Sequence, residues 1–264
     1  MFNFFARARQ NEKSHETIKQ QAIQEDFNDI DIEPIAQYFK LETGISFEKQ
    51  QSILKSKLIS FCKINNIPGF KKCLAQVKTD LKIKQELINY LTTNESFFYR
   101  ELHQIQDLVH KVRLSDQPVS ILCAPSSTGE EIYSIVIALI EAEIEKNRFN
   151  IVGIDINSNA LKQAELGVYN QRNISNIPSH LLAKHFNKKE SKYYLNDEIK
   201  QCVQLKTENI FNSSFKLLGK FDYIFCRNML IYFDSEAKIK ARKILESLLK
   251  DKKNPIYFGH ADLF

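Results

Sequence analysis

The chain reads Val119-Ser120-Ile121-Leu122-Cys123-Ala124-Pro125-Ser126-Ser127-Thr128-Gly129-Glu130-Glu131 near its middle, an apolar run followed by a turn of small residues and the start of a helical pattern. A strand–turn–helix of this kind is where a doubly wound fold offers backbone N–H groups to a ligand. A second segment, Phe221-Asp222-Tyr223-Ile224-Phe225-Cys226-Arg227-Asn228-Met229-Leu230-Ile231-Tyr232-Phe233, reads as a buried strand that ends in polar groups. We expect these polar groups to form, with the turn at 124–129, a single ligand-binding site.

Strand and helix patterns alternate on both sides of these segments. Apolar runs predict strands at 119–123, 149–154, 221–226 and 255–259, and helical patterns cover 130–146, 158–166 and 235–249. This alternation predicts an α/β fold, a doubly wound and mostly parallel sheet with helices on both faces. It breaks between Tyr169 and Leu205, where 192–196 and 199–205 read as short strands around the turn Asn196-Asp197. We expect an inserted antiparallel hairpin or small sheet there.

The part of the chain before residue 93 has a different pattern. Two apolar stripes have helical spacing, one made by Ile53, Leu54, Leu58 and Phe61 and one by Phe70, Cys73, Leu74 and Val77. Asn65-Asn66-Ile67-Pro68-Gly69 breaks the pattern between them, and about four helices are expected. The predicted organisation is a polar extension at 1–30, a helical domain at 31–92, a linking segment at 93–118 and an α/β domain at 119–264 with a β-subdomain inserted at about 176–205.

Composition restricts the class of protein. The 264 residues are 43% hydrophobic and 26% charged, which is ordinary for a globular protein. No run of about 18 apolar residues is present, so no membrane insertion is expected, and the N-terminus lacks the order of a signal peptide. The five cysteines form no CxxC pair. The sequence therefore predicts no metal site and a cytoplasmic, reducing location.

Charge is uneven along the chain. The net charge is +5, and residues 40–91 hold ten basic and four acidic side chains, a local +6 that leaves the remainder at −1. A basic half suggests an anionic partner, which could be nucleic acid, a membrane surface or an acidic protein. A lysine-rich solvated helix face explains the same composition equally well.

The turn after the first strand has one glycine, Gly129, and neither of the glycine patterns that bind phosphates. Its ligand therefore need not carry phosphate. Glu130 and Glu131 suit a helix N-terminus, or one of them faces the ammonium of a bound amino acid. Asp155 ends the second strand 25 residues after Glu130, where dinucleotide folds bind ribose hydroxyls. Alternatively it caps the next helix, a role that Asn157 or Ser158 could also take.

A third candidate element is Thr93-Asn94-Glu95-Ser96-Phe97-Phe98-Tyr99-Arg100-Glu101, directly before the sheet domain. Three consecutive aromatic residues are typical of a core. Because polar residues surround them, the segment could also place an aromatic wall and a cation over a ligand.

These segments together resemble the CheR family, which methylates glutamates on bacterial chemoreceptors using S-adenosylmethionine. The family's N-x-T-x-F-F-R-E motif is similar to Asn94–Glu101, with Ser96 for threonine and Tyr99 for phenylalanine. Its G-x-S-T-G-E-E-P-Y-S loop is similar to 124–134, with Pro125 for a glycine and Ile132 for the proline. Its F-D-x-I-x-C-R-N-x-L-I-Y-F motif matches 221–233 in full. Its D-I-D, A-x-x-G-x-Y and final G-H-S-E resemble 155–157, 164–169 and 259–262.

The resemblance implies a class I methyltransferase-like fold and a cofactor, S-adenosylmethionine, that becomes S-adenosylhomocysteine. It implies that the segment 93–101 contacts the cofactor, that Glu130 (or Glu131) binds the methionyl amine and that Asp155 binds the ribose. The implied cofactor-binding residues are Asn94, Ser96, Arg100, Glu130, Asp155, Asn209, Ile210, Cys226, Arg227 and Asn228, and the implied catalytic residues are Arg100 and Tyr232.

The implied activity is a protein-glutamate O-methyltransferase acting on methyl-accepting chemotaxis receptors, with the β-subdomain matching the one that docks receptor tails in some members. A glutamate is ionised at pH 7, since its pKa is about 4.3, so no general base is needed. A monomer without a nucleic-acid partner is expected. A non-catalytic CheR-like signalling module is the alternative, favoured by Pro125 and by the short segment after His260. A nucleic-acid methyltransferase ranks last, because no N/D-P-P-Y/F motif is present.

Overall fold

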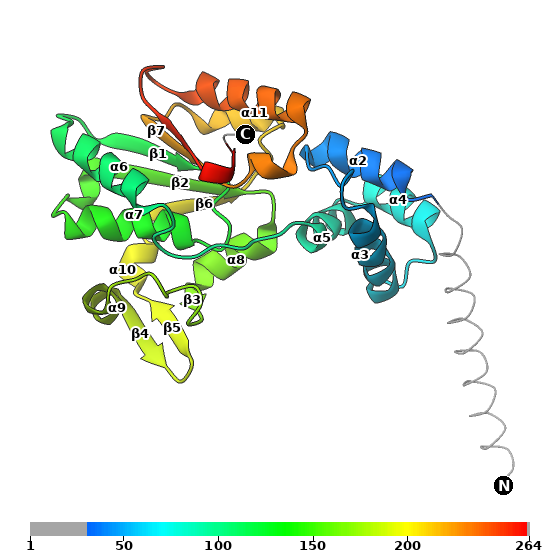
Figure 1. Ribbon diagram of the computed structural model, residues 1–264, viewed down its shortest axis with the longest axis horizontal. Coiled ribbons are helices and arrows are strands. Elements are labelled where there is room, and N and C mark those ends of the chain that lie inside the picture. The colour runs from blue at the N-terminus through cyan, green and yellow to red at the C-terminus, as the bar shows by residue number, and fades with distance from the viewer. Residues whose placement is uncertain (1–30, 263–264) are drawn as a thin grey trace, which may run out of the picture. The chain divides into compact units, whose positions relative to one another are not determined.

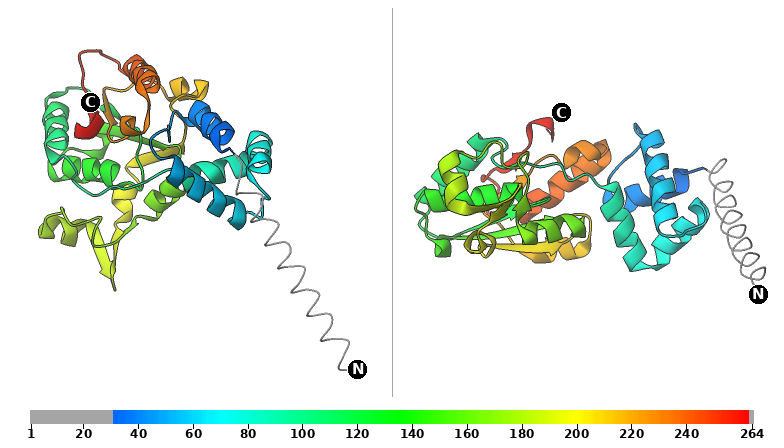
Figure 2. Two further views of the ribbon diagram at one scale, coloured as in Figure 1. Left: turned by 45° about the vertical axis from the view of Figure 1, so that its right-hand side comes forward. Right: turned by 90° about the horizontal axis from the view of Figure 1, so that it is seen from below.

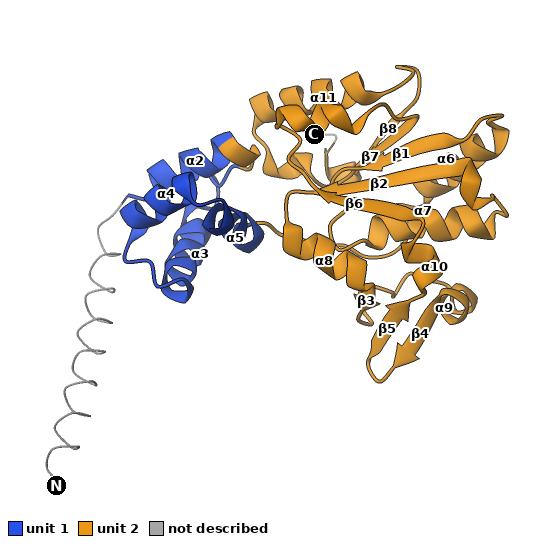
Figure 3. Cartoon of the chain, turned by 180° about the vertical axis from the view of Figure 1, so that it is seen from behind, with its two compact units in different colours: residues 1–41, 46–91 blue, residues 42–45, 92–264 orange. Residues whose placement is uncertain are grey.

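The computed structural model describes residues 31–262 of the chain. Two compact units divide them: unit 1 holds residues 31–41 and 46–91, and unit 2 holds 42–45 and 92–262 (Figure 3). The predicted polar extension at 1–30 lies outside the described residues. Each unit is considered by itself.

Unit 1 is built from helices. They are α2 (Glu33–Thr43, whose last two residues belong to unit 2), α3 (Gln51–Ile64), α4 (Phe70–Thr79) and α5 (Leu81–Leu91). The predicted stripe on α3 is buried at Leu54, Leu58 and Phe61, whereas Ile53 is 50% exposed. Adjacent helical residues point about 100° apart, so Ile53 cannot share the buried face with all the others. The predicted break is present, with left-handed backbone at Asn66 and Gly69.

The larger sheet of unit 2, with five strands, is parallel throughout (Figure 1). Its order is β6-β2-β1-β7-β8, formed by β1 (Val119–Cys123), β2 (Phe149–Asp155), β6 (Val203–Thr207), β7 (Tyr223–Cys226) and β8 (Ile256–Phe258). The doubly wound prediction is confirmed. The chain leaves β1 toward β2 on one side and reaches β7 on the other, so a switch in strand order lies beside β1. In open α/β sheets ligands bind outside the carboxyl ends of the strands at such a point.

Helices cover both faces of this sheet (Figure 2). Successive residues of β1 point to opposite faces: Ile121 belongs to one core cluster and Leu122 to another. The first cluster includes apolar residues of α6 (Leu102–Leu114) and α7 (Glu130–Glu141), and the second includes those of α11 (Ser235–Leu248). The remaining elements beside the sheet are α8 (Ser158–Leu166) and the short 3₁₀ helices η1 (Lys146–Arg148), η2 (Ser213–Leu218), η3 (Leu230–Tyr232) and η4 (His260–Asp262).

A small antiparallel sheet is inserted between β2 and β6, as expected. Its order is β3-β5-β4, from β3 (Val168–Tyr169), β4 (Phe186–Lys189) and β5 (Lys192–Leu195), with α9 (Ser179–His185) before β4. The predicted pairing of 192–196 with 199–205 is wrong. Asn196 starts the helix α10 (Asp197–Lys200) instead of a hairpin turn, a position that asparagine also favours. Residues 203–207 then pair with β2 in the main sheet.

Candidate active site

The loops that follow the parallel strands all lie at one edge of the sheet, because parallel strands share their carboxyl ends. The register places Cys123 beside Gly153 and Phe225, and Asp155 beside Thr207. The site residues predicted at the strand ends are therefore brought to this edge within unit 2: Glu130, Asp155, Asn209, Ile210, Cys226, Arg227, Asn228 and Tyr232.

The turn after β1 closes against β2. The Ser126 N–H donates to the Ile154 carbonyl oxygen at 2.7 Å. Gly129 has a left-handed backbone with φ of 96°, and a Cβ there would lie 2.6 Å from the Tyr133 ring. A side chain at this position is therefore excluded by both conformation and space. The Ser127 hydroxyl oxygen is buried and has no hydrogen-bond partner among the described residues.

Asp155 is 5% exposed and does not cap the next helix. That role belongs to Asn157, whose side-chain oxygen accepts the N–H groups of Asn159 and Ala160 at 2.9 Å each. The Asp155 carboxylate accepts the N–H of Ser127 and that of Asn157, one on each oxygen at 2.8 Å. Burial raises its pKa to about 6. The backbone N–H of Ile156 also favours the ionised form. Because a carboxylate has about four lone-pair sites, acceptor capacity remains for a ligand hydroxyl group.

Glu130 is fully buried at the start of α7, and its hydrogen-bond partners are neutral. Its carboxylate accepts from the Thr128 hydroxyl at 2.6 Å and from the Asn173 side-chain amide at 2.7 Å. Burial raises the pKa of the Glu130 carboxyl, while these bonds and one from the Ser96 side chain oppose the rise. No cation pairs with Glu130 among the ion pairs of the described chain. The site thus holds a buried acid that no cation of the described residues pairs with.

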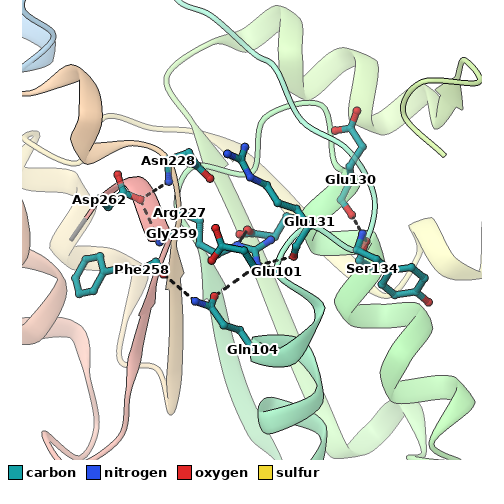
Figure 4. Close-up of polar contacts among 12 residues, drawn as sticks. Glu101, Gln104, Glu130, Glu131, Ser134, Arg227, Asn228, Phe258, Gly259 and Asp262 are labelled. Atoms are coloured by element: carbon teal, nitrogen blue, oxygen red, sulfur yellow. Dashed lines mark hydrogen bonds and ion pairs between the residues drawn. The ribbon is translucent and has the colours of Figure 1, made fainter. Parts of the chain in front are cut away.

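Glu131, the next residue, has a different environment (Figure 4). It forms a buried ion pair with Arg227, whose Nη1 also donates to the Arg100 carbonyl oxygen at 2.8 Å. Gln104 lies within 3.5 Å of the same Nη1. A buried charge is costly unless it is paired, and here the pair also fixes the backbone of the motif segment. The two adjacent glutamates are therefore not equivalent: Glu131 is paired by the protein and Glu130 is not.

Backbone N–H groups attach the segment 94–101 to α7 and to the loop after β3. The Phe98 N–H donates to the Asn173 carbonyl oxygen at 2.9 Å, and the Tyr99 N–H donates to the Ser134 hydroxyl at 3.0 Å. Phe98 and Tyr99 are buried in the core under α7. The aromatic run thus serves packing, which was one of the two sequence interpretations. The polar residues Asn94, Ser96 and Arg100 are half-buried.

Arg100 and Tyr232 are brought near each other. The Arg100 guanidinium lies over the Phe97 ring, 5.4 Å from its centroid. Tyr232, in η3, is 37% exposed. Burial raises the pKa of the Tyr232 hydroxyl, and the positive charge of Arg100 acts in the opposite direction. Both side chains are thus polar, partly accessible groups at the same edge.

Three of the other predicted residues have side chains that contact other parts of the protein. The Asn209 side chain donates to the Glu42 carbonyl oxygen at 2.5 Å and accepts the Phe211 N–H at 2.9 Å. Cys226 is fully buried in the core cluster that includes α11, and Arg227 is held by Glu131. Ile210 is also buried, at 5% exposure, whereas Asn228 is half-buried.

The sequence analysis did not identify three polar residues that organise this edge. Asn173 joins Glu130 to the Ser96 carbonyl oxygen, and Gln104 donates to the Phe258 carbonyl oxygen at 2.8 Å. Asp262 accepts backbone N–H groups of the loop after β7. Only Asp262 had a sequence signal, since it stands in the matched G-H-x-x segment. Asn173 and Gln104 follow no recognised motif position.

The described residues fit the cofactor that the motifs imply. The buried Glu130 carboxylate suits an ammonium group, and the Asp155 carboxylate retains acceptor capacity for a hydroxyl group. The unpartnered Ser127 hydroxyl lies in the turn between them. Residues 31–262 contain no group of three or more His, Cys, Asp or Glu side chains arranged to hold a metal. Over the same residues no helix has the length and apolarity needed to cross a membrane.

The family model and the similar proteins found by comparison all point to the same family. The family model for the CheR methyltransferase, SAM binding domain, matches residues 94–264. A chemotaxis protein methyltransferase of Campylobacter jejuni is 36% identical over 222 residues, covering 84% of this chain and 84% of that protein. Chemotaxis protein methyltransferase 2 of Vibrio cholerae is 33% identical over 242 residues, covering 85% and 82%. A chemotaxis protein methyltransferase of Borreliella burgdorferi is 30% identical over 231 residues, covering 81% of each.

Proposed function

We propose that this chain, which belongs to the CheR methyltransferase family, transfers methyl groups from S-adenosylmethionine to glutamate side chains of chemotaxis receptors. Family membership makes it an S-adenosylmethionine-dependent methyltransferase. The names of the relatives favour this activity over a non-catalytic signalling module. The glutamate acceptor and the receptor partner are the parts that we infer.

The observation that carries the proposal is the contrast between Glu130 and Glu131. A fully buried carboxylate with only neutral partners is unfavourable unless a cation reaches it. The methionyl ammonium of the cofactor is such a cation. We therefore assign Glu130 to the ammonium and Asp155 to the ribose hydroxyls. Ser127, with its unpartnered hydroxyl, is an additional polar contact for the same ligand.

The remaining predicted residues have supporting or lining roles in this proposal. Asn94 and Ser96 face the cofactor from the motif segment, and Ile210 provides an apolar wall for the adenine. Asn209 acts through its position, because its side chain is bonded to backbone groups of Glu42 and Phe211. Cys226, Arg227 and Asn228 shape the methyl-donor side. Arg227 does so indirectly by holding the Arg100 carbonyl oxygen.

The chemistry requires orientation rather than proton transfer. When bound, the cofactor supplies a methyl group on a positively charged sulfur. The acceptor glutamate is already ionised at neutral pH, since its pKa is about 4.3. Arg100 can orient one oxygen of the acceptor, and the Tyr232 hydroxyl can donate to the other. A close ion pair would make the attacking oxygen less nucleophilic, so Arg100 is assigned to positioning.

A double-mutant cycle tests the ammonium assignment. Wild-type protein and Glu130→Gln are titrated by calorimetry with S-adenosylhomocysteine and with an analogue that lacks the amino group. The analogue should bind wild type at least about tenfold more weakly, which corresponds to about 1.4 kcal/mol. The variant should show little difference between the two ligands. An equal difference in both proteins would show that the amino group is bound elsewhere.

A transfer assay tests the activity itself. Receptor-containing membranes from the source organism are incubated with methyl-labelled S-adenosylmethionine and the protein. Carboxyl methyl esters release methanol in mild base, whereas N-methyl groups do not. The proposal predicts base-labile label on the receptor. Base-stable label would contradict the glutamate acceptor while leaving the methyltransferase activity in place.

A further inference from the structure

Asp262, at the end of η4, presents a buried carboxylate to the loop after β7. The residue is 1% exposed. Its Oδ2 accepts the N–H groups of Asn228 and of Gly259, the latter at 3.1 Å (Figure 4). Its Oδ1 accepts the Ile231 N–H at 3.2 Å. Hydrogen bonds to an ionised acceptor are about twice as strong as neutral ones. One side chain therefore connects β8 with two points of the loop 228–232.

The backbone of this loop departs from regular structure at two places. Asn228 has a left-handed φ of 59°, a conformation that asparagine adopts more readily than most residues other than glycine. Leu230 to Tyr232 form a single 3₁₀ turn, η3, which is too short to be stable alone. The Asp262 carboxylate accepts the N–H groups of both Asn228 and Ile231. It therefore stabilises the left-handed backbone at Asn228 and the η3 turn at the same time.

The space around Asp262 is an independent observation. A Cβ added to Gly259 would lie 2.9 Å from the Asp262 Oδ2, 3.0 Å from the Asn228 nitrogen and 3.1 Å from the Asn228 Oδ1. The absence of a side chain at Gly259 thus lets the carboxylate reach the loop. Arg242 of α11 donates to the Asp262 carbonyl oxygen at 3.2 Å. The backbone of Asp262 is thus also bonded to α11.

We propose that Asp262 is a positioning residue for the methyl acceptor. It sets Asn228 and Tyr232 in the orientation that the transfer requires, without contacting the substrate itself. The inference rests on the proposed function and deepens it. Glu130 and Asp155, which are assigned to the ammonium and to the ribose, share no hydrogen-bond partner with Asp262. Asn228, on the methyl-donor side, is bonded to Asp262 through its backbone N–H. Loss of Asp262 should therefore affect turnover more than cofactor affinity.

The test compares two aspartates that carry the same kind of bond at opposite ends of the sheet. Asp222 precedes β7, and its carboxylate accepts the Ser120 N–H at 2.7 Å and pairs with Lys250 at 2.7 Å. Asp262→Asn and Asp222→Asn therefore make the same chemical change. Each variant is assayed for kcat of receptor methylation, KM for receptor, cofactor affinity by calorimetry and thermal stability.

The expected result is a loss of about tenfold to a hundredfold in kcat for Asp262→Asn, the scale of a displacement of about 1 Å at a reacting group. Its cofactor affinity should stay within about twofold of wild type. Asp262→Glu, which keeps the charge, should recover part of the rate. Asp222→Asn should keep the wild-type kcat even if it melts earlier.

Gly259→Ala is the second variant, because it crowds the carboxylate without removing it. Gly259→Ala should lower kcat, as Asp262→Asn should. It therefore still tests the inference if Asp262→Asn does not fold. A wild-type kcat in either Asp262→Asn or Gly259→Ala would overturn the inference about Asp262 and leave the proposed function in place. An equal loss in Asp222→Asn would assign the effect to general stability and also overturn it. If wild-type protein transfers no methyl group to receptor, the proposed function itself fails, and the inference fails with it.

Discussion

At the scale of single residues, the site is defined by which buried carboxylates have a cationic partner in the protein and which do not. Glu131 is paired with Arg227, whereas Glu130 and Asp155 are buried acids that hydrogen-bond only to neutral groups. Burial raises the pKa of all three carboxyls in the free protein, and only for Glu131 does the charge of Arg227 oppose that rise. A ligand that provides an ammonium or hydroxyl donors favours the ionised forms. Binding is consequently coupled to the release of protons.

The first prediction concerns the pH dependence of cofactor affinity. Burial raises the Asp155 pKa to about 6 in the free protein, and hydroxyl donors lower it in the complex. The association constant for the cofactor should reach its maximum above pH 6, where Asp155 is ionised. It should fall as the pH drops through 6, by at most about tenfold per pH unit for this group. Glu130 changes affinity in the same direction. Calorimetry between pH 7.5 and 5 measures the slope.

Asp155→Ala provides the comparison. Removing the carboxylate should weaken binding at pH 7.5 by about tenfold or more, since a hydrogen bond to a charged group contributes about 1.5–3 kcal/mol. The variant should also lose the part of the pH slope that belongs to this residue. Unchanged affinity together with an unchanged slope would remove Asp155 from the ribose assignment.

The second prediction separates binding from turnover at Arg100. The proposed role is to orient the acceptor carboxylate, so Arg100→Ala should reduce kcat of methyl transfer much more than it reduces cofactor affinity. Arg100→Lys keeps the charge but not the planar fork, and it should lie between wild type and alanine. Equal losses of kcat and affinity would mean that Arg100 mainly binds cofactor.

At the scale of elements, the site is assembled from segments that are far apart in sequence. Asn173, just after β3, connects the motif segment to α7 through Ser96 and Glu130. The loop after β7 depends on Asp262 beyond β8. The secondary structure thus brings polar ends to one edge, and a few side chains between elements fix their positions.

The third prediction tests the Asn173 connection. Asn173→Ala removes a hydrogen bond from the buried Glu130 carboxylate and a contact to the Ser96 carbonyl oxygen. Without this bond the pKa of the Glu130 carboxyl rises further, so less of it is ionised to bind an ammonium, and cofactor affinity should fall roughly fivefold or more. Asn187→Ala, an exposed asparagine on β4 that pairs with Asn196, is the matched control and should bind normally. Normal binding by Asn173→Ala would show that the motif segment is held without it.

Some elements could be predicted from sequence and others could not, for physical reasons. The runs 119–123 and 221–226 are apolar except at Ser120 and Asp222, because β1 and β7 are largely buried on both faces. Strand β6 alternates Val203 and Leu205 with polar residues, which is typical of an edge strand in either sheet. Its sequence therefore did not decide between an antiparallel hairpin and the parallel edge that the structure shows.

The same limit applies to the site. Residues that end a strand, such as Asp155, were predicted because their position follows from local pattern alone. Asn173 and Gln104 were not, because their partners depend on packing between distant segments. Cys226 was assigned to the pocket by family resemblance, but it is fully buried in a core cluster. Strand periodicity decides which face of the sheet a side chain occupies.

At the scale of the whole molecule, the two units differ in charge and composition. Residues 40–91, mostly in unit 1, carry the local +6. Within that range Lys71 and Lys72 on α4 are exposed, whereas Lys57 donates to the Leu91 carbonyl oxygen. Exposed lysines of this kind mainly influence the rate of encounter with a charged partner.

The fourth prediction follows for receptor docking. Reversing the charge at Lys71 and Lys72 to glutamate should slow receptor methylation at low salt, and the difference should diminish at high salt, where surface charges are screened. Cofactor affinity should not change. Lys252→Glu with Lys253→Glu, an exposed pair in unit 2, is the control and should have a smaller effect. Equal rates for the Lys71 and Lys72 variant and wild type would place the docking surface elsewhere.

The identity of the methylated atom tests the central claim most directly. Receptor from the source organism is reacted with S-adenosylmethionine and this protein, digested and analysed by tandem mass spectrometry under acidic conditions that preserve esters. The account predicts one added methylene mass on glutamate side chains of the receptor's cytoplasmic helices, absent when those glutamates are replaced by alanine. Methylation on lysine, on a terminus or on co-purifying nucleic acid, with unmodified glutamates, would contradict it.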